Sequence, residues 1–226
     1  MMISPEGYYE EYLKGKTKEQ ILTVIRGLKQ EIGRLKNTME SPDYGVKPIM
    51  HPSEDTRLHW TREYLERAKQ ALAEAGGTYT LPKSEEKVSD FDANMDAICK
   101  ITFSIGGFFG GYRSYVVELS DRLKAYTKLW EDEEPLSLVD DDNKEPFTKD
   151  TFIAALKELH IGEWRRRYST KRFGYTVCDG TQWELKFEYN NGHKPVMFDG
   201  DNSYPYNFDK FQILFGIDET EEGEDE

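Results

Sequence analysis

The sequence predicts an α+β protein, in which an N-terminal antiparallel, coiled-coil-like helical hairpin precedes an antiparallel sheet with two helices. Three observations favour this class: apolar residues at helical spacing in the first third of the 226 residues, glycine-punctuated apolar runs after it, and a change of charge between the two parts. The predicted organisation is a hairpin over residues 1–80, a linker over 81–94, an α+β module over 95–217 and an acidic, disordered tail over 218–226.

The first helix of the hairpin is expected to begin at a capping box. Thr17 can accept a hydrogen bond from the third backbone N–H of the helix, and Gln20 can reach back to the Thr17 backbone. Apolar residues then recur in alternating steps of four and three, which is typical of a coiled-coil seam. They are Ile21, Ile25, Leu28, Ile32, Leu35 and Met39.

The second helix is expected to start at Ser53 as its N-cap and to end at Gly76-Gly77. Two helices joined by a Pro-containing loop of about a dozen residues are expected to pack antiparallel. Because so short a hairpin buries little apolar surface alone, we expect it to pack on the second module, on a partner or on a second copy as a homodimer.

Turn signals divide the second part into short elements. Strands are expected at residues 98–105, 112–119, 123–130, 175–178, 182–189 and 194–198, and helices at 148–159 and 207–215. Gly106 to Gly111 fits a hairpin turn better than a phosphate-binding loop, since no Lys-Ser/Thr follows and a strand rather than a helix comes next. Asp179-Gly180 predicts a hairpin between the fourth and fifth strands.

The negative charge is confined to the second part of the chain. Residues 1–80 carry 12 basic and 12 acidic residues, whereas residues 81–226 carry 18 basic and 31 acidic ones, which accounts for the net charge of −13. Residues 131–145 and 218–226 concentrate the excess. One interpretation is a solvated loop and a solubilising tail. The other is that these acids attract a basic partner and compete for its binding groove.

No catalytic or metal-binding motif stands out. The four histidines (His51, His59, His160 and His193) are far apart in the sequence, and the two cysteines, Cys99 and Cys178, form no close pair. No Gly-x-Ser-x-Gly element occurs. We therefore expect no cofactor, no metal and no enzymatic activity, with an enzyme whose site is assembled from distant residues as an alternative.

A basic run interrupts the acidic half of the chain and alternates with aromatic residues from Trp164 to Phe173. Such a mixture suits phosphates and stacked bases, but it equally suits internal pairing with the acidic loop. The candidate partner-binding residues come from this run, from other aromatic residues and from the acidic loop. They are Trp164, Arg165, Arg166, Arg167, Tyr112, Trp183, Tyr204, Asp140, Asp141 and Asp142.

Part of the chain resembles a module of uncharacterised bacterial proteins. The resemblance rests on Gly110-Gly111-Tyr112, on Asp179-Gly-Thr-Gln-Trp183 and on Asn202-Ser-Tyr204-Pro-Tyr-Asn207-Phe208, and it spans about residues 98–215. It implies a fold unit and no activity. Within it, Trp183 is expected to be either a core residue or part of a recognition groove with Trp164, Tyr112 and Tyr204.

These features predict a cytoplasmic, non-membrane interaction protein that binds or blocks a basic surface of a protein partner. A mobile-element inhibitor of anti-CRISPR-like or other anti-defence type would suit the composition. The alternative is a nucleic-acid-binding regulator that uses the basic run from Arg165 to Arg172, which would bind less tightly as salt increases.

Overall fold

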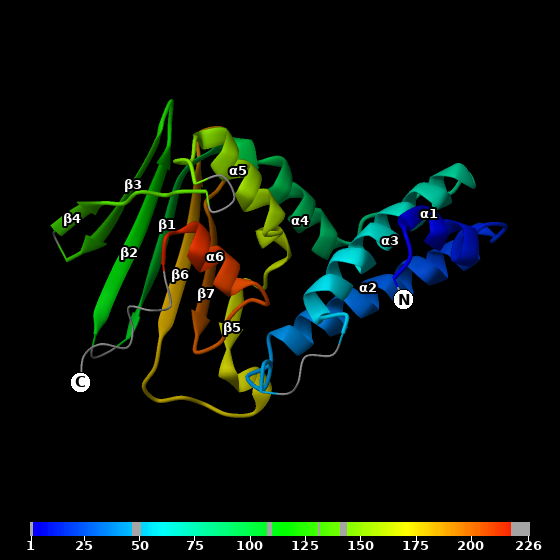
Figure 1. The fold of residues 1–226 in the computed structure, drawn as a ribbon, viewed down its shortest axis with the longest axis horizontal. Helices are drawn as coiled ribbons and strands as arrows, with labels where there is room; N and C mark the ends of the chain where they lie inside the picture. The colour runs from blue at the N-terminus through cyan, green and yellow to red at the C-terminus, as the bar shows by residue number, and fades with distance from the viewer. Residues whose placement is uncertain (1, 47–50, 108–109, 131, 141–143, 218–226) are drawn as a thin grey trace. The chain divides into compact units, whose positions relative to one another are not determined.

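The chain divides into two compact units, Met1–Pro82 and Lys83–Glu226. The computed structural model describes residues 2–46, 51–107, 110–130, 132–140 and 144–217 (Figure 1). The predicted acidic tail and residues 141–142 of the acidic loop lie outside these ranges. No helix within them combines the length and the apolar character that crossing a membrane requires.

The first unit is built around the predicted hairpin, α2 (Lys18–Met39) and α3 (Glu54–Glu74), which pack against each other. The capping box is confirmed, because Thr17 Oγ1 accepts from Gln20 N and Gln20 Oε1 accepts from Thr17 N. Ser53 caps α3 as expected. Four of the six seam residues are buried, whereas Ile32 and Met39 are partly exposed.

Two short elements at the N-terminus complete this unit. They are α1 (Pro5–Tyr8) and the π-helix η1 (Tyr9–Leu13). The ring of Tyr8 stacks on that of Tyr64 with centroids 4.2 Å apart, and the Tyr64 hydroxyl donates to Ile3 O at 2.7 Å. Leu13 is buried in the same apolar cluster as the α2 seam. The N-terminal segment therefore supplies apolar cover that the two long helices lack by themselves.

The second unit contains one seven-stranded sheet in the order β4-β3-β2-β1-β6-β7-β5. The strands are β1 (Ile98–Gly107), β2 (Gly111–Leu119), β3 (Leu123–Leu129), β4 (Asp132–Pro135), β5 (Arg167–Ser169), β6 (Gln182–Tyr189) and β7 (Val196–Asp201). Neighbouring strands are antiparallel except β5 and β7, which are parallel and make the sheet mixed. The helices are α4 (Lys83–Ala93), α5 (Lys149–Glu158) and α6 (Phe208–Leu214), with short 3₁₀ turns η2 (Met95–Ala97), η3 (Ile161–Glu163) and η4 (Thr170–Phe173). The predicted α+β class is confirmed.

Helices cover one face of this sheet and leave the other face open (Figure 1). The Phe211 ring of α6 lies 5.0 Å from that of Phe103 in β1, and the Phe91 ring of α4 lies 5.1 Å from that of Phe187 in β6. Burying each such ring contributes about 1.5–3 kcal/mol. Because successive side chains of a strand point to opposite faces, the intervening residues of these strands lie on the open face.

Several details of the sequence prediction are wrong. The sheet is mixed rather than purely antiparallel, because β5 pairs with β7 in parallel at the edge, and three α-helices rather than two accompany it within the described ranges. Residues 83–93 of the predicted linker form α4, which Phe91 anchors to the sheet with its ring buried. Residues 175–178 form no strand, and Asp179-Gly180 is not a hairpin turn. The physical reason is that both edges of β6 are already paired, with β1 on one side and β7 on the other, so no edge is left for the preceding segment.

Candidate functional site

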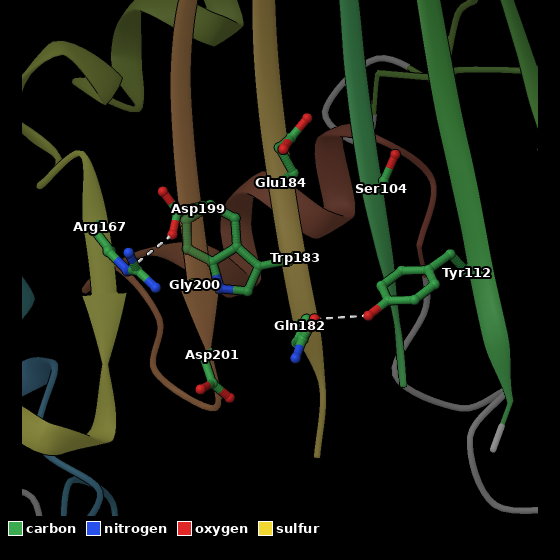
Figure 2. A pocket seen from close by; sticks show the side chains of 9 residues that line it. All are labelled: Ser104, Tyr112, Arg167, Gln182, Trp183, Glu184, Asp199, Gly200 and Asp201. Carbon is green, nitrogen blue, oxygen red and sulfur yellow. Dashed lines mark hydrogen bonds and ion pairs between the residues drawn. The ribbon is translucent and has the colours of Figure 1, made fainter. Parts of the chain in front are cut away.

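A hollow of about 490 Å³ lies on the open face of the sheet (Figure 2). Its lining comes from five of the seven strands: Ser104, Tyr112, Arg167, Gln182, Trp183, Glu184, Asp199, Gly200 and Asp201. The strand register explains this gathering, since Ser104 pairs with Glu184, and Glu184 in turn pairs with Asp199. Ser104, Glu184 and Asp199 therefore share one face of the sheet, since they occupy matching positions on neighbouring strands.

One wall of the hollow crosses β1 at Gly106, where the strand has no side chain. Gly106 of β1 pairs with Tyr112 on one side and with Gln182 on the other. The Tyr112 hydroxyl donates across it to Gln182 Oε1 at 2.7 Å (Figure 2). A Cβ on Gly106 would overlap the backbone of Gly111 and Tyr112. Gly106 therefore has a structural role in the hairpin, as the sequence predicts. It also lets the side chain of Tyr112, which is 49% exposed, form the wall.

The opposite wall is an exposed ion pair. Arg167 Nε of edge strand β5 lies 3.4 Å from Asp199 Oδ2 of β7 (Figure 2). Such exposed pairs are worth at most about 1 kcal/mol. Glu184 stands between the two walls, and its carboxylate has no hydrogen bond or ion pair among the described residues. With Asp201, the lining carries three carboxylates against one guanidinium, so its net charge is −2.

A partly buried turn holds Asp201 in place at the end of β7. Asn202 has a left-handed backbone, φ +47°, which asparagine tolerates better than most residues. Its Oδ1 accepts from Thr181 N at 2.9 Å and its Nδ2 donates to Asp201 Oδ1 at 2.8 Å. A side chain on Gly180 would overlap the Asn202 amide. The Asp-Gly-Thr and Asn-x-Tyr-Pro segments therefore meet and fix the rim of the hollow.

The two tryptophans predicted as candidates belong to the core. Trp183 is 2% exposed and Trp164 is 4% exposed. The Trp183 indole donates to Ser203 O at 3.0 Å and covers Gly200, where a Cβ would overlap it. The Trp164 indole donates to Asn207 Oδ1 at 2.9 Å. The recognition groove expected from these aromatics does not form, because Trp183 points to the covered face of β6 and the Trp164 ring packs against the Trp183 ring, with centroids 6.3 Å apart.

The remaining candidates are dispersed. Tyr204 is partly exposed, with its ring 4.9 Å from that of Phe208 in the core. Asp140 is partly exposed and belongs to a backbone turn, in which Asp140 N donates to Glu145 O and Asp140 O accepts from Lys144 N. Asp141 and Asp142 lie outside the described residues. Of the ten candidate residues, the structure brings Tyr112, Arg167 and Trp183 together at the hollow.

The basic run is partly absorbed into the fold. The Arg166 guanidinium lies 4.5 Å from the centroid of the Phe198 ring, and desolvation lowers the pKa of Arg166. Arg167 pairs with Asp199, as described above. Arg165, Lys171 and Arg172 have exposed side chains. The sequence suggested that this run pairs with the acidic loop. Arg167 instead pairs with Asp199 of strand β7.

Tyr189, next to Arg166, carries a buried hydroxyl with no hydrogen-bond partner among the described residues. Burial raises the pKa of Tyr189 to about 12, with Arg166 opposing the shift and Asp90 adding to it. Because the folded pKa lies above the ordinary value of 10.0, this group's contribution to stability is complete below pH 10 and is lost as the pH rises towards 12.

Replacing Tyr189 with Phe is therefore expected to raise the free energy of unfolding at pH 7 by about 1 kcal/mol, since it removes an unpaired buried hydroxyl. It should also reduce the loss of stability between pH 10 and 12. Urea denaturation of both proteins across this range measures both effects. A Y189F variant that is less stable at pH 7, or that has the same alkaline profile as the wild type, would contradict this account.

Sequence reasoning missed most of the hollow, namely Ser104, Gln182, Glu184, Asp199 and Asp201. A signal was present, because polar residues alternate with apolar ones from Gln182 to Glu188 and so mark an open strand face. Within the described ranges, no group of three or more His, Cys, Asp or Glu residues is placed to hold a metal ion. The arrangement offers carboxylates, an aromatic wall and an amide, which together suit a cationic group.

Comparison of the chain with known protein families, with curated proteins and with solved structures produced no match. The geometry of the site is therefore the basis on which its function is inferred.

Proposed function

We propose that this protein is a non-enzymatic interaction module whose second unit binds a protein partner with a basic surface. The observation that carries the proposal is the hollow on the open sheet face, with its net charge of −2 and the carboxylate of Glu184, which is unpaired among the described residues. An arginine or lysine side chain of the partner would pair with Glu184 and Asp201 and lie against the Tyr112 ring.

The acidic character of the second unit supports this mode of binding. All residues of β4 are exposed, and three of the four are acidic. An excess of negative charge speeds the encounter with a cationic protein and is sensitive to salt. In a cell such a module would inhibit its partner by occupying the partner's basic surface. An anti-defence protein of a mobile element would act in this way.

The binding prediction can be tested with a fluorescently labelled oligo-arginine peptide, followed by anisotropy at low salt. The double variant Glu184→Gln/Asp201→Asn is expected to bind the peptide roughly threefold to tenfold more weakly, since partly exposed ion pairs each contribute about 0.2–1 kcal/mol. The matched control, Glu158→Gln/Asp209→Asn, removes the same charge from exposed positions on the helices. Equal weakening in both variants would show that net charge, not the hollow, binds the peptide.

The exposed cations of the basic run, Arg165, Lys171 and Arg172, support nucleic-acid contact as a second candidate function. A labelled single-stranded oligonucleotide is the matching probe, because stacked aromatics and cations bind such strands without sequence preference. Binding that decreases steeply with salt and is lost in Arg165→Ala/Lys171→Ala/Arg172→Ala would favour this candidate over the first.

A further inference from the structure

The connection between β3 and β4 carries a tryptophan that the fold does not explain. Leu129 pairs with Asp132, so the two strands are joined by a two-residue connection that begins with Trp130. Trp130 has a left-handed backbone with φ +58°. Connections of this length favour Gly, Asn or Asp at such positions, because a bulky side chain meets the backbone there.

The side chain of Trp130 gains little from folding. It is 82% exposed, whereas Trp164 and Trp183 of the same unit are buried. The conformational strain is therefore not repaid by burial within the described chain. A strained, exposed aromatic is informative about function, since tryptophan is the residue most enriched among the energetic centres of protein interfaces.

The surroundings of Trp130 indicate the kind of partner. A Cβ on Gly111 would lie 3.9 Å from Cζ2 of Trp130, which places the indole beside the start of β2, the strand that carries Tyr112 of the hollow. Leu129, just before it, is 38% exposed. On the other side of the connection, Asp132, Glu133 and Glu134 of β4 are exposed. Glu133 Oε1 lies 3.7 Å from Lys128 Nζ.

We propose that Trp130 is the apolar anchor of an interface with a protein partner that carries arginine or lysine side chains around an apolar pocket. Trp130 and Leu129 fill the pocket, and the carboxylates of β4 form an acidic rim that faces the cations. This proposal rests on the proposed function, because it extends the same basic partner from the hollow across β2 to the β3–β4 connection. Charge complementarity favours a basic protein over a second copy of this chain, because the rim is acidic and the chain has a net charge of −13.

The test uses two labelled arginine-rich peptides of equal length and charge, one with leucine and the other with serine at the same positions. The wild type is expected to prefer the leucine peptide. Trp130→Asn should bind the leucine peptide at least about tenfold more weakly and lose the preference, as expected for an interface anchor, while its affinity for the serine peptide is retained. Tyr175→Asn, which removes another exposed aromatic of the same unit, should leave both affinities unchanged.

The proposal for the hollow and the proposal for the anchor predict different experimental results. Glu184→Gln/Asp201→Asn should weaken both peptides and keep the preference for leucine. If Trp130→Asn keeps that preference, the anchor is wrong and the hollow stands. If the wild type binds neither peptide, both proposals are wrong.

A stability measurement separates an anchor from a structural residue. Because asparagine tolerates the left-handed backbone, Trp130→Asn should raise the melting temperature by about 2–4 °C. A melting temperature that falls by this amount or more would show that Trp130 stabilises the fold, and would overturn the assignment of Trp130 as a binding residue.

Discussion

Replacing Trp183 with alanine is expected to lower the free energy of unfolding of the second unit by about 3–5 kcal/mol, the cost of truncating a buried aromatic. The indole is almost fully buried, and its ring lies 5.0 Å from that of Phe208 and 6.3 Å from that of Trp164. Removing it leaves a cavity beneath the hollow and takes away the donor to Ser203 O. Urea denaturation followed by circular dichroism measures the loss.

Two further variants make this result interpretable. Trp183→Phe keeps most of the packing and removes the hydrogen bond, so it should cost about 1–3 kcal/mol. Met197→Ala, on the open face of β7, should cost less than about 0.5 kcal/mol, because Met197 is exposed. If Trp183→Ala costs no more than Met197→Ala, then Trp183 is a surface residue and the assignment of the covered face is wrong.

Replacing Asn207 with alanine should have the second largest effect, a loss of about 2–5 kcal/mol. The buried Asn207 amide accepts from the Trp164 indole at 2.9 Å and donates from Nδ2 to Leu159 O at 2.8 Å. Without the amide, a buried N–H and a buried carbonyl lose their partners, and each unsatisfied group costs about 1–3 kcal/mol. Denaturant unfolding measures this loss as well.

The control for Asn207 is an exposed residue of α6, the helix that follows Asn207. Ile213 of α6 is exposed, so Ile213→Ala should change stability by less than about 0.5 kcal/mol. Similar costs for the two variants would mean that the amide does not connect α5 to α6. Because Asn207 occupies the N-cap position of α6 without capping it, a loss confined to α6 helicity would also contradict the bridging role.

Local sequence was sufficient for the elements whose signals lie within a few residues. The caps at Thr17 and Ser53 start helices where predicted, because a capping side chain bonds a backbone N–H only three residues away. The first three strands also appear within a few residues of their predicted limits. Local signals were insufficient for α4, whose one buried residue, Phe91, packs against Phe187 of the sheet.

The site itself depended on strand order, which no local signal contains. The alternation from Gln182 to Glu188 separates an apolar from a polar face, and it also indicates that Trp183 points to the apolar one. Only the three-dimensional structure, however, puts β6 between β1 and β7 and adds β5 as a parallel edge. That order brings Glu184, Asp199 and Arg167 together from distant segments, because strand pairing is decided by the burial of the whole apolar face rather than by neighbouring residues.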